Sequence, residues 1–464
     1  MKVLFPILFL TFSSLGLFAQ DNEDPGLRLD PLWTSQSSSN GFWTPRLAID
    51  AEGNLYSGGT YQNYLRTADT TYSQPPQTFR ERFANSIFMQ GHSTSGELKW
   101  TTYVEGQGRM HAIEVDEEGN SYYSGLFWSS TLVVVSPNGS RDSLRMKGFN
   151  KSGIYVIKLD REGNYLNSGY FGLDRNDEAN KLVLDSKGNI YVGGVYLYRK
   201  ENELIRSFLL LKFDPELNLE WLMDGDTVGM SQITALQVDG SDNLYVGGVY
   251  KQNLSLGSMG LNSEDEKRWP FIAKLRSNGE VKWISKTIAD KEGAYFDLSV
   301  SAIQLDFWRN IYVAGGSQSR AFVSRLSRKG KFKWSNQSYG RSNYSFGLIK
   351  NSDSKNLIHF GHGYGGKFSF QAGDTIEYKT VGSTDIFIHE ETRKGRHILS
   401  LVGGGEGTDY VTDLRYHDGY LYVIGNDLGG RKIKFKEKEI LPPDYRANFP
   451  VKPSVWIACF KWVE

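Results

Sequence analysis

The stretch IEVDEEGNSYYSG, residues 113–125, contains the pattern that decides the fold. Apolar and polar residues alternate from Ile113 to Val115, and alternation with period two is typical of a β-strand that has one face in a core. The segment Asp-Glu-Glu-Gly-Asn that follows has the composition of a tight turn, in which the Asp side chain caps the turn and Gly or Asn adopts the positive φ. A second strand then ends in Tyr-Tyr-Ser-Gly. The stretch therefore predicts a β-hairpin.

The same hairpin unit recurs along most of the chain. Its other copies are AIDAEGNLYSGG (48–59), LVLDSKGNIYVGG (182–194), LQVDGSDNLYVGG (236–248), IQLDFWRNIYVAGG (303–316), LIKNSDSKNLIHFG (348–361) and LRYHDGYLYVIG (414–425). From Tyr56 in the first copy to Tyr422 in the last, the six steps span 366 residues, or about 61 residues per unit. A fixed period of this kind is the sequence signature of a repeat architecture.

A second pair of strands follows each hairpin. It consists of a β-rich segment, a turn that contains Gly, and a segment that in most copies closes on Trp. These copies lie at 86–100, 153–167, 207–221, 270–283, 321–334 and 385–399. Four strands per unit predict an all-β fold, a seven-bladed β-propeller with four-stranded blades. Because Trp and Tyr recur at equivalent positions, we expect them to pack between blades rather than to bind a ligand.

The two ends of the repeat region complement each other. Residues 31–36, PLWTSQ, match the fourth strand of a blade, whereas residues 454–464, SVWIACFKWVE, match a third strand. We therefore expect the N-terminal strand to complete the C-terminal blade and close the ring, which would remove an exposed sheet edge. Residues 20–464 then form a single domain.

Long connections separate the second and third strands in several units. They span 60–85, 127–152, 251–269, 364–384 and 426–453, and contain alternating pieces such as STLVVV and KIKFKEKEI. Because alternation favours strands over an unstructured loop, we expect ordered hairpins that project from one face of the ring. The fifth unit has only GSQSR at 316–320 and should lack the hairpin.

Residues 1–19 have the features of a cleavable signal peptide. Lys2 precedes an apolar run from Val3 to Leu17, and Ala19 provides the small residue before the expected cleavage site. The run is shorter than a membrane span needs, so we expect no transmembrane segment in the mature chain. The prediction is an exported protein that is periplasmic, associated with the outer membrane or extracellular.

Composition argues against several functions. The chain has 53 Lys and Arg against 53 Asp and Glu, so its average charge predicts no basic field to attract nucleic acid or anionic lipid. Its single Cys rules out an internal disulfide framework and a cysteine-rich metal site. The repeated turn Asp residues belong to separate blades, so they are expected to cap turns rather than converge on calcium. We expect no cofactor and no metal.

The pattern Asp-x-x-Gly-Asn-x-Tyr-Val-x-Gly, followed by Phe-x-x-Lys-Leu, Gly and Trp, resembles the SBBP-type seven-bladed β-propeller repeat of exported bacterial proteins. Its best copies are 182–221 and 236–283, and the likeness covers nearly all of the mature chain. The resemblance implies an interaction module of the bacterial envelope or exterior, with no catalytic set shared across the family. It therefore predicts a non-catalytic scaffold that binds a protein partner.

Functional residues are sought where the repeats differ, in the loops that lead from one blade into the first strand of the next and form the channel mouth. These loops contribute Trp43, Arg46, Arg109, His111, Asp177, Glu178, Lys181, Tyr344, Asp409 and Tyr410. Such a mixed set of charges and aromatic rings suits a protein loop or a polar ligand. The alternative function is a glycan-binding or carbohydrate-active protein that uses this mouth, where paired carboxylates such as Asp177 and Asp409 could do acid–base work. The sequence leaves open whether the protein is an enzyme.

Overall fold

The protein is almost entirely β-sheet. The computed structural model describes residues 31–38, 42–67, 70–73, 85–146, 152–172, 176–200, 203–225, 230–263, 267–287, 298–317, 320–340, 344–364, 367–372, 374–379, 384–404, 409–427, 433–435, 438–440 and 454–461. All regular elements in these ranges are β-strands, which confirms the all-β prediction. Among the same residues there is no helix of the length and apolar character that a membrane span requires.

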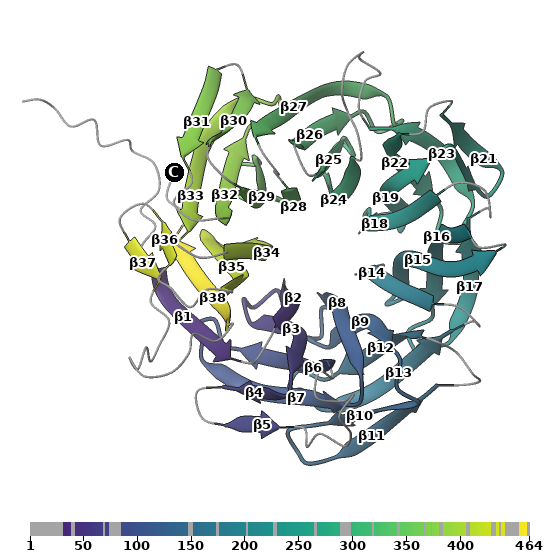
Figure 1. The fold of residues 1–464 in the computed structure, drawn as a ribbon, viewed down its shortest axis with the longest axis vertical. Helices are drawn as coiled ribbons and strands as arrows, with labels where there is room; N and C mark the ends of the chain where they lie inside the picture. The colour runs from purple at the N-terminus through teal and green to yellow at the C-terminus, as the bar shows by residue number, and fades with distance from the viewer. Residues whose placement is uncertain are drawn as a thin grey trace, which may run out of the picture.

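Antiparallel sets of four strands recur in chain order, as the repeat predicts. In the second unit β8 (Gly108–Val115), β9 (Ser121–Phe127), β12 (Gly153–Leu159) and β13 (Tyr165–Phe171) pair in that order. Equivalent sets are β2 (Phe42–Ile49), β3 (Leu55–Gln62), β6 (Asn85–His92) and β7 (Leu98–Glu105); β14 (Asn176–Leu184), β15 (Ile190–Lys200), β16 (Glu203–Phe213) and β17 (Leu219–Asp224); β18 (Met230–Val238), β19 (Leu244–Lys251), β22 (Arg268–Leu275) and β23 (Val281–Lys286); β24 (Ser299–Leu305), β25 (Ile311–Ser317), β26 (Arg320–Leu326) and β27 (Phe332–Gly340); β28 (Tyr344–Lys350), β29 (Leu357–Tyr364), β32 (Thr384–Glu391) and β33 (His397–Gly404). Figure 1 shows these sheets around a central space in a propeller-like ring, with the first strand of each set nearest the centre.

The first and last strands of the described chain lie side by side. β34 (Asp409–His417), β35 (Tyr420–Asp427) and β38 (Ser454–Lys461) pair in that order, and β1 (Pro31–Ser38) pairs antiparallel with the other edge of β38. Trp33 is opposite Cys459 in this register. The two strands are adjacent in Figure 1. Residues 31–38 thus occupy the fourth position next to the C-terminal third strand.

Four of the inserted hairpins extend sheets sideways instead of projecting from one face, so that prediction is wrong for them. β10 (Thr131–Val135) and β11 (Arg141–Arg145) belong to the second unit, yet β10 pairs with β7, the outermost strand of the first unit. In the same way β4 (Tyr64–Arg66) and β5 (Thr71–Ser73) join β1, β30 (Lys367–Ala372) and β31 (Asp374–Lys379) join β27, and β36 (Ile433–Phe435) and β37 (Lys438–Ile440) join β33. An outermost strand has free N–H and C=O groups along its edge, and the hairpin from the next unit satisfies some of them.

The remaining insertion, in the fourth unit, behaves differently. β20 (Asn253–Leu256) and β21 (Met259–Asn262) form a separate two-stranded hairpin. In the fifth unit β25 and β26 pair directly, with Ser317 opposite Arg320, which confirms that this unit has no extra hairpin.

The recurring Trp residues pack between consecutive units, as predicted. Trp100 closes β7 of the first unit, and its Nε1 donates a hydrogen bond of 2.9 Å to the carbonyl oxygen of Arg161 in the second unit. Within its own unit the Trp100 ring also contacts the Tyr56 ring, at 6.2 Å between centroids. Equivalent Tyr–Trp contacts occur at Tyr191–Trp221 (6.0 Å), Tyr245–Trp283 (6.2 Å) and Tyr312–Trp334 (6.5 Å).

The recurring Asp residues cap their own turns, which is also the predicted role. Asp116 Oδ1 accepts hydrogen bonds from the backbone N–H groups of Glu118 (3.1 Å) and Asn120 (2.7 Å). Asp116 Oδ2 accepts from Asn120 Nδ2 and from the hydroxyl of Tyr122, each at 3.0 Å. Asp50, Asp185 and Asp239 make the same four kinds of bond. Each carboxylate is therefore already occupied within its own turn.

Candidate functional site

A β-bulge interrupts the innermost strand of each unit near its start. The register shifts lie between Trp43 and Arg46, Met110 and Ala112, Ala179 and Lys181, Ile233 and Ala235, Val300 and Ala302, Ser345 and Gly347, and Val411 and Asp413. A bulge takes one residue out of the regular ladder and redirects its side chain. The bulges therefore set which side chains of the channel-mouth segments reach the neighbouring units.

The last Gly of the repeat motif makes room for this bulge. A Cβ on Gly125 would lie 1.8 Å from the carbonyl oxygen of Arg109, and one on Gly194 would lie 2.0 Å from that of Glu178. Because no side chain could occupy these positions, a Gly opposite the bulge is a steric requirement of the strand pair.

The bulge residues link successive units through side-chain to backbone hydrogen bonds. His111 Nδ1 donates to the carbonyl oxygen of Ala179 at 2.6 Å, and Asn180 Nδ2 donates to that of Ile233 at 2.9 Å. Thr412 Oγ1 donates to the carbonyl oxygen of Pro45 at 2.7 Å. Thr234 makes the equivalent bond to the carbonyl of Val300. These bonds satisfy carbonyl groups that the bulges leave outside the ladder.

In the first unit the bulge includes Pro45, and the Arg46 side chain makes the hydrogen bonds to backbone carbonyls of the neighbouring units. Its Nε donates to the carbonyl oxygen of His111 at 3.0 Å and its Nη1 to that of Thr412 at 2.5 Å. One guanidinium group thus connects β2 with β8 on one side and with β34 on the other. Planar guanidinium groups suit such paired contacts because their donors point in fixed directions.

Further charged side chains surround Arg46 on the innermost strands. Burial raises the pKa of Glu114 to about 7, although the nearby Arg415 opposes the rise. Burial, with the charge of Arg46 next in size, lowers the pKa of Lys181 to about 8. Asp413 forms an ion pair with Arg415. Both shifted groups therefore change charge close to neutral pH.

The structure brings together four of the ten predicted site residues. Arg46 contacts His111 and is electrostatically coupled to Lys181. Glu178 lies nearby, with its Oε1 3.7 Å from His111 Nδ1. Burial is the main cause that lowers the pKa of His111, which favours the neutral ring. These four side chains form one polar cluster that joins the first, second, third and last units.

Of the other predicted residues, Arg109 borders this cluster, since its charge contributes to lowering the pKa of His111, whereas the rest lie beside other partners or outside the described side chains. The Arg109 guanidinium stacks 5.8 Å from the ring centroid of Trp128, and the Tyr410 ring contacts His362 at 4.8 Å between centroids. Asp177 is fully buried. The side chains of Trp43, Tyr344 and Asp409, on β2, β28 and β34, lie outside the described part of the structure.

Sequence reasoning missed Glu114, Asp413, Arg415 and Trp128. Glu114 and Arg415 lie deeper in the innermost strands than the loops that were searched, whereas Asp413 is the last residue of a searched segment and was not singled out. The sequence did contain a signal for two of them: Glu114 and Arg415 occupy a repeat position that is apolar in other copies, such as Val183 and Ile349. Trp128 follows the second strand of its unit, at the same end of the sheet as the searched loops.

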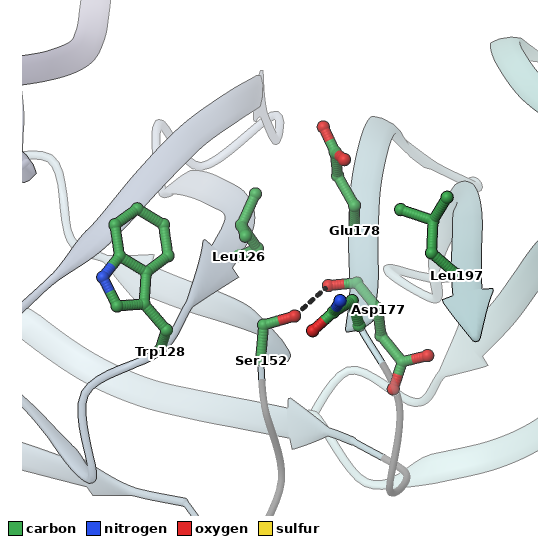
Figure 2. Close-up of a pocket in the computed structure, with 7 residues that line it drawn as sticks. Leu126, Trp128, Ser152, Asp177, Glu178 and Leu197 are labelled. Atoms are coloured by element: carbon green, nitrogen blue, oxygen red, sulfur yellow. Dashed lines mark hydrogen bonds between the residues drawn. The ribbon is translucent and has the colours of Figure 1, made fainter. Parts of the chain in front are cut away.

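A pocket of about 260 Å³ opens between the second and third units (Figure 2). It is lined by Leu126, Trp128, Ser152, Asn176, Asp177, Glu178 and Leu197. Trp128 Nε1 donates to Gln107 Oε1 at 2.5 Å, which holds the indole in place. The Ser152 hydroxyl donates to the backbone carbonyl of Asp177 at 3.2 Å.

The two acidic residues of the pocket do not form a catalytic pair. Asp177 and Glu178 are successive residues of β14, so their carboxylates extend to opposite sides of the strand, as Figure 2 shows. Only Glu178 is partly exposed; Asp177 is buried. The pocket therefore offers an aromatic wall, two Leu side chains and one accessible carboxylate.

Comparison with known proteins assigns no family. No protein-family model matches the chain. Among curated proteins, a G-type lectin S-receptor-like serine/threonine-protein kinase of Arabidopsis thaliana is 27% identical over 190 residues, which cover 37% of this chain and 21% of the kinase. The chain thus spans about a fifth of the length of the curated relative that it matches.

Three solved structures illustrate the structural likeness. A protein of unknown function from Bacteroides caccae is 10% identical, with 65% of this chain and 93% of that chain covered and a TM-score of 0.32. The endosialidase of phage phi92 is 9% identical, with 94% and 70% covered and a TM-score of 0.41. PorZ, a surface component of the type-IX secretion system of Porphyromonas gingivalis, is 11% identical, with 85% and 59% covered and a TM-score of 0.31. Likeness of this degree says nothing about the ligands of this chain.

Proposed function

We propose that the chain is a closed seven-bladed β-propeller of the SBBP type that serves as a non-catalytic protein-interaction scaffold in the envelope or at the surface of a bacterium. The proposal of a closed ring is supported by the recurring four-stranded sets and by the pairing of β1 with β38. The proposal of export is supported by the apolar segment that follows Lys2.

The observation that carries the scaffold proposal is that polar side chains near the ring centre form hydrogen bonds to the neighbouring units. Arg46, His111, Asn180 and Thr412 donate to backbone carbonyls of neighbouring units. A catalytic acid, base or nucleophile has to face a substrate, whereas these groups hold units together. The polar cluster therefore supports a rigid ring that holds its partner-binding surfaces in fixed positions.

The pocket between the second and third units is the partner site that the geometry supports best. Trp128 provides an aromatic face that already accepts the guanidinium of Arg109, and Glu178 provides a carboxylate on the other wall. An aromatic ring beside a carboxylate favours a cationic group. We expect a Lys or Arg side chain from a loop of the partner to enter here.

The test is co-purification of the tagged chain from gently solubilised envelopes of its host, with partners identified by mass spectrometry. The variant Trp128→Ala/Glu178→Gln should lose a stoichiometric partner. The control variant Leu166→Ala/Glu162→Gln changes exposed residues of the same unit away from the pocket and should keep the partner. A chain that purifies without partners, or a partner that the pocket variant retains, would contradict the proposal.

A second candidate function is glycan binding in the same pocket, because an aromatic wall beside a hydroxyl, an amide and a carboxylate also suits a sugar ring. Calorimetric titration with a panel of oligosaccharides separates the two. Sugar binding that Trp128→Ala abolishes would favour the glycan function. If no sugar gives a measurable heat of binding, the protein-partner function is favoured.

A further inference from the structure

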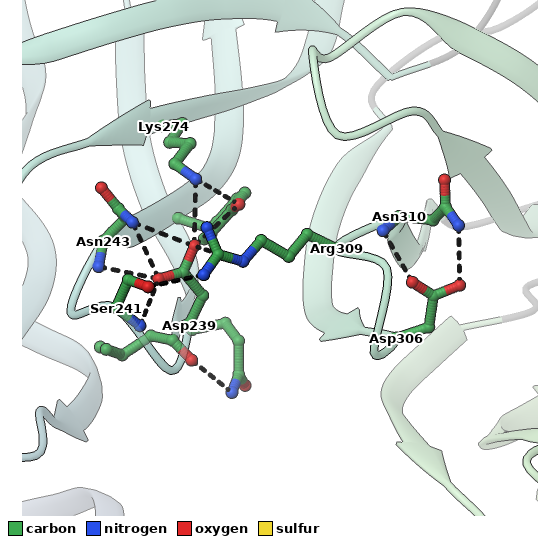
Figure 3. A network of polar contacts seen from close by, with 10 residues as sticks. Asp239, Ser241, Asn243, Lys274, Asp306, Arg309 and Asn310 are labelled. Carbon is green, nitrogen blue, oxygen red and sulfur yellow. Dashed lines mark hydrogen bonds and ion pairs between the residues drawn. The ribbon is translucent and has the colours of Figure 1, made fainter.

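The hairpin turns that carry the repeated Asp residues form one continuous face of the ring, which we call the turn face. Ion pairs and hydrogen bonds connect neighbouring turns: Arg161 Nη2 lies 2.8 Å from Glu52 Oε1, and the Ser186 hydroxyl donates to Asp242 Oδ2 at 3.1 Å. Figure 3 shows Arg309 reaching from its own turn to the turn that contains Asp239 and Ser241. The turns therefore hold one another in position on this face.

Two large aromatic residues project from the turn face. Phe307 is 90% exposed and Trp308 is 60% exposed, at the tip of the turn between β24 and β25. The equivalent positions of the second unit are Glu117 and Glu118, so the turn itself does not require apolar residues. Exposing this much apolar surface is unfavourable, and it marks a surface that meets something other than water.

The tip that carries these rings is rigid. Arg309 Nη2 donates to the Ser241 hydroxyl at 2.5 Å, and its Nε lies 4.0 Å from Asp239 Oδ2 (Figure 3). Asp306 accepts from the backbone N–H and the Nδ2 of Asn310, each at 2.8 Å. Because both ends of the turn are bonded, Phe307 and Trp308 cannot easily fold back onto the sheet.

The rings form a wedge and not a flat stacking surface. The Phe307 and Trp308 rings stand at 88° to each other, with centroids 6.0 Å apart. The Arg393 guanidinium covers one face of Trp308 at 5.0 Å from its centroid. A sugar or a nucleobase stacks on an open ring face, whereas a projecting wedge suits insertion into a soft apolar layer.

Basic residues are concentrated in the turn of the wedge and in the outer turns of the fifth and sixth units. The turns 306–310, 327–331 and 392–396 together contain seven basic residues and one acidic residue: Arg309, Arg328, Lys329, Lys331, Arg393, Lys394, Arg396 and Asp306. Asp306 is buried and bonded within its turn. We call these three turns with Phe307 and Trp308 the basic wedge.

The opposite side of the ring has the reverse charge. The turns 50–54, 116–120 and 160–164 contain seven acidic residues and one basic residue, Arg161. Figure 1 places β2, β8 and β12, which lead into these turns, across the ring from β24, β26 and β32. The zero net charge of the chain therefore hides a strongly polarised face, and the expectation from average composition was too coarse.

We infer that the basic wedge docks the protein onto an anionic lipid surface, with Phe307 and Trp308 inserted among the headgroups. Clusters of four to eight Lys and Arg bind anionic lipid, and Trp is favoured at the membrane interface. The acidic turns would be repelled by the same surface, so we expect a tilted orientation in which only the fifth and sixth units touch the membrane. This inference is independent of the pocket near Trp128.

The test is co-sedimentation of the purified chain with vesicles of phosphatidylethanolamine and phosphatidylglycerol, compared with vesicles of phosphatidylcholine, at low and high salt. We expect binding to the anionic vesicles at least tenfold tighter, and lost at high salt. Lys329→Glu/Lys394→Glu should weaken binding by more than tenfold, at about fivefold or more for each basic residue removed. Phe307→Ser/Trp308→Ser should weaken it by about tenfold.

The matched control is Glu117→Ser/Glu118→Ser, which changes the equivalent turn positions on the acidic side and should bind at least as tightly as the wild type. Brominated lipids should quench part of the tryptophan fluorescence of the wild type and less of Trp308→Phe. Circular dichroism checks that each variant is folded. Equal binding to both kinds of vesicle, or no effect of the aromatic variant, would overturn the inference. So would salt-sensitive self-association in place of vesicle binding, because it would show that the basic wedge meets the acidic turns of a second copy.

Discussion

The indole of Trp100 lies directly against Gly163 of the next unit. A Cβ on Gly163 would lie 2.4 Å from the Trp100 ring, and Trp100 Nε1 donates to the carbonyl oxygen of Arg161 in the same turn. Trp283 and Gly330 repeat the contact, with a corresponding Cβ distance of 2.7 Å. The Gly of the outer turn and the Trp of the preceding unit therefore act as a pair, although the two pairs are separated by different numbers of residues along the chain.

Gly163→Ala is expected to destabilise the fold by about 3 kcal/mol. The substitution puts a methyl group into the Trp100 ring and also places a Cβ at a φ of 82°. The matched control is Gly139→Ala, at a φ of 86° with no atom within 4 Å of the added Cβ, which should cost only about 1 kcal/mol. Urea unfolding followed by circular dichroism measures both, and equal losses would show that the Trp100 contact contributes nothing.

Arg46→Ala is expected to destabilise the fold by about 2–4 kcal/mol, because it removes the donors to the carbonyls of His111 and Thr412. Arg46→Lys should recover only part of this, since one ammonium group cannot reach both carbonyls with the same geometry. Arg328→Ala, on an exposed turn, is the control and should unfold like the wild type. Denaturant unfolding and limited proteolysis check the prediction. Wild-type stability of Arg46→Ala would mean that Arg46 serves a ligand and not the ring.

Glu114→Gln is expected to change how stability depends on pH. Burial raises the pKa of Glu114 to about 7, so the folded state holds a proton that the unfolded chain releases near pH 4.5. The stability of the wild type should therefore fall as the pH rises from 4.5 to 7, and Glu114→Gln should remove roughly 1–2 kcal/mol of that fall. Unfolding free energies at several pH values in this window test it. Glu118→Gln, on an exposed turn, is the control, and an unchanged slope in Glu114→Gln would refute the prediction.

Lys274→Met is expected to weaken the fold at neutral pH more than in acid. Burial alone would raise the pKa of Asp239, but hydrogen bonds from Asn243 and Lys274 outweigh it and hold that pKa at about 2. This stabilisation is present above pH 3.8 and is lost as the pH falls toward 2. We expect Lys274→Met to lose about 1–2 kcal/mol at pH 7 and little at pH 2.

The control for this prediction is Lys282→Met, which breaks an exposed ion pair with Glu280 and should have no measurable effect. Urea unfolding at pH 7, 4 and 2 compares the two variants. A deficit of Lys274→Met that is the same at all three pH values would mean that Lys274 acts through packing on the Tyr245 ring, which it contacts at 4.7 Å.

Much of the site could not be predicted because a bulge resets the alternation of a strand. The loops that contain Arg46, His111, Glu178 and Lys181 were identified from the repeat, but the convergence of these four side chains was not predicted. Glu114 and Arg415 were missed because they follow the searched loops, at positions where the repeat predicted core and solvent by period two, and Asp413 was read with its loop without being singled out. Only the paired strands show that the bulges at Met110–Ala112 and Val411–Asp413 shift this alternation.

The amino-acid sequence by itself determined the strands and the capped turns, because both depend on residues that are close in the chain and recur with the repeat. The tertiary structure alone decided where the inserted hairpins attach, since β10 pairs with β7 through an edge that belongs to another unit. It also decided the distribution of charge. The 53 basic and 53 acidic residues balance in the sum, yet folding places the acidic turns of the first two units on one side of a face and the basic turns of the fifth and sixth units across from them. Electrostatic fields depend on the distances between charges in space, and a count of charged residues contains no information about those distances.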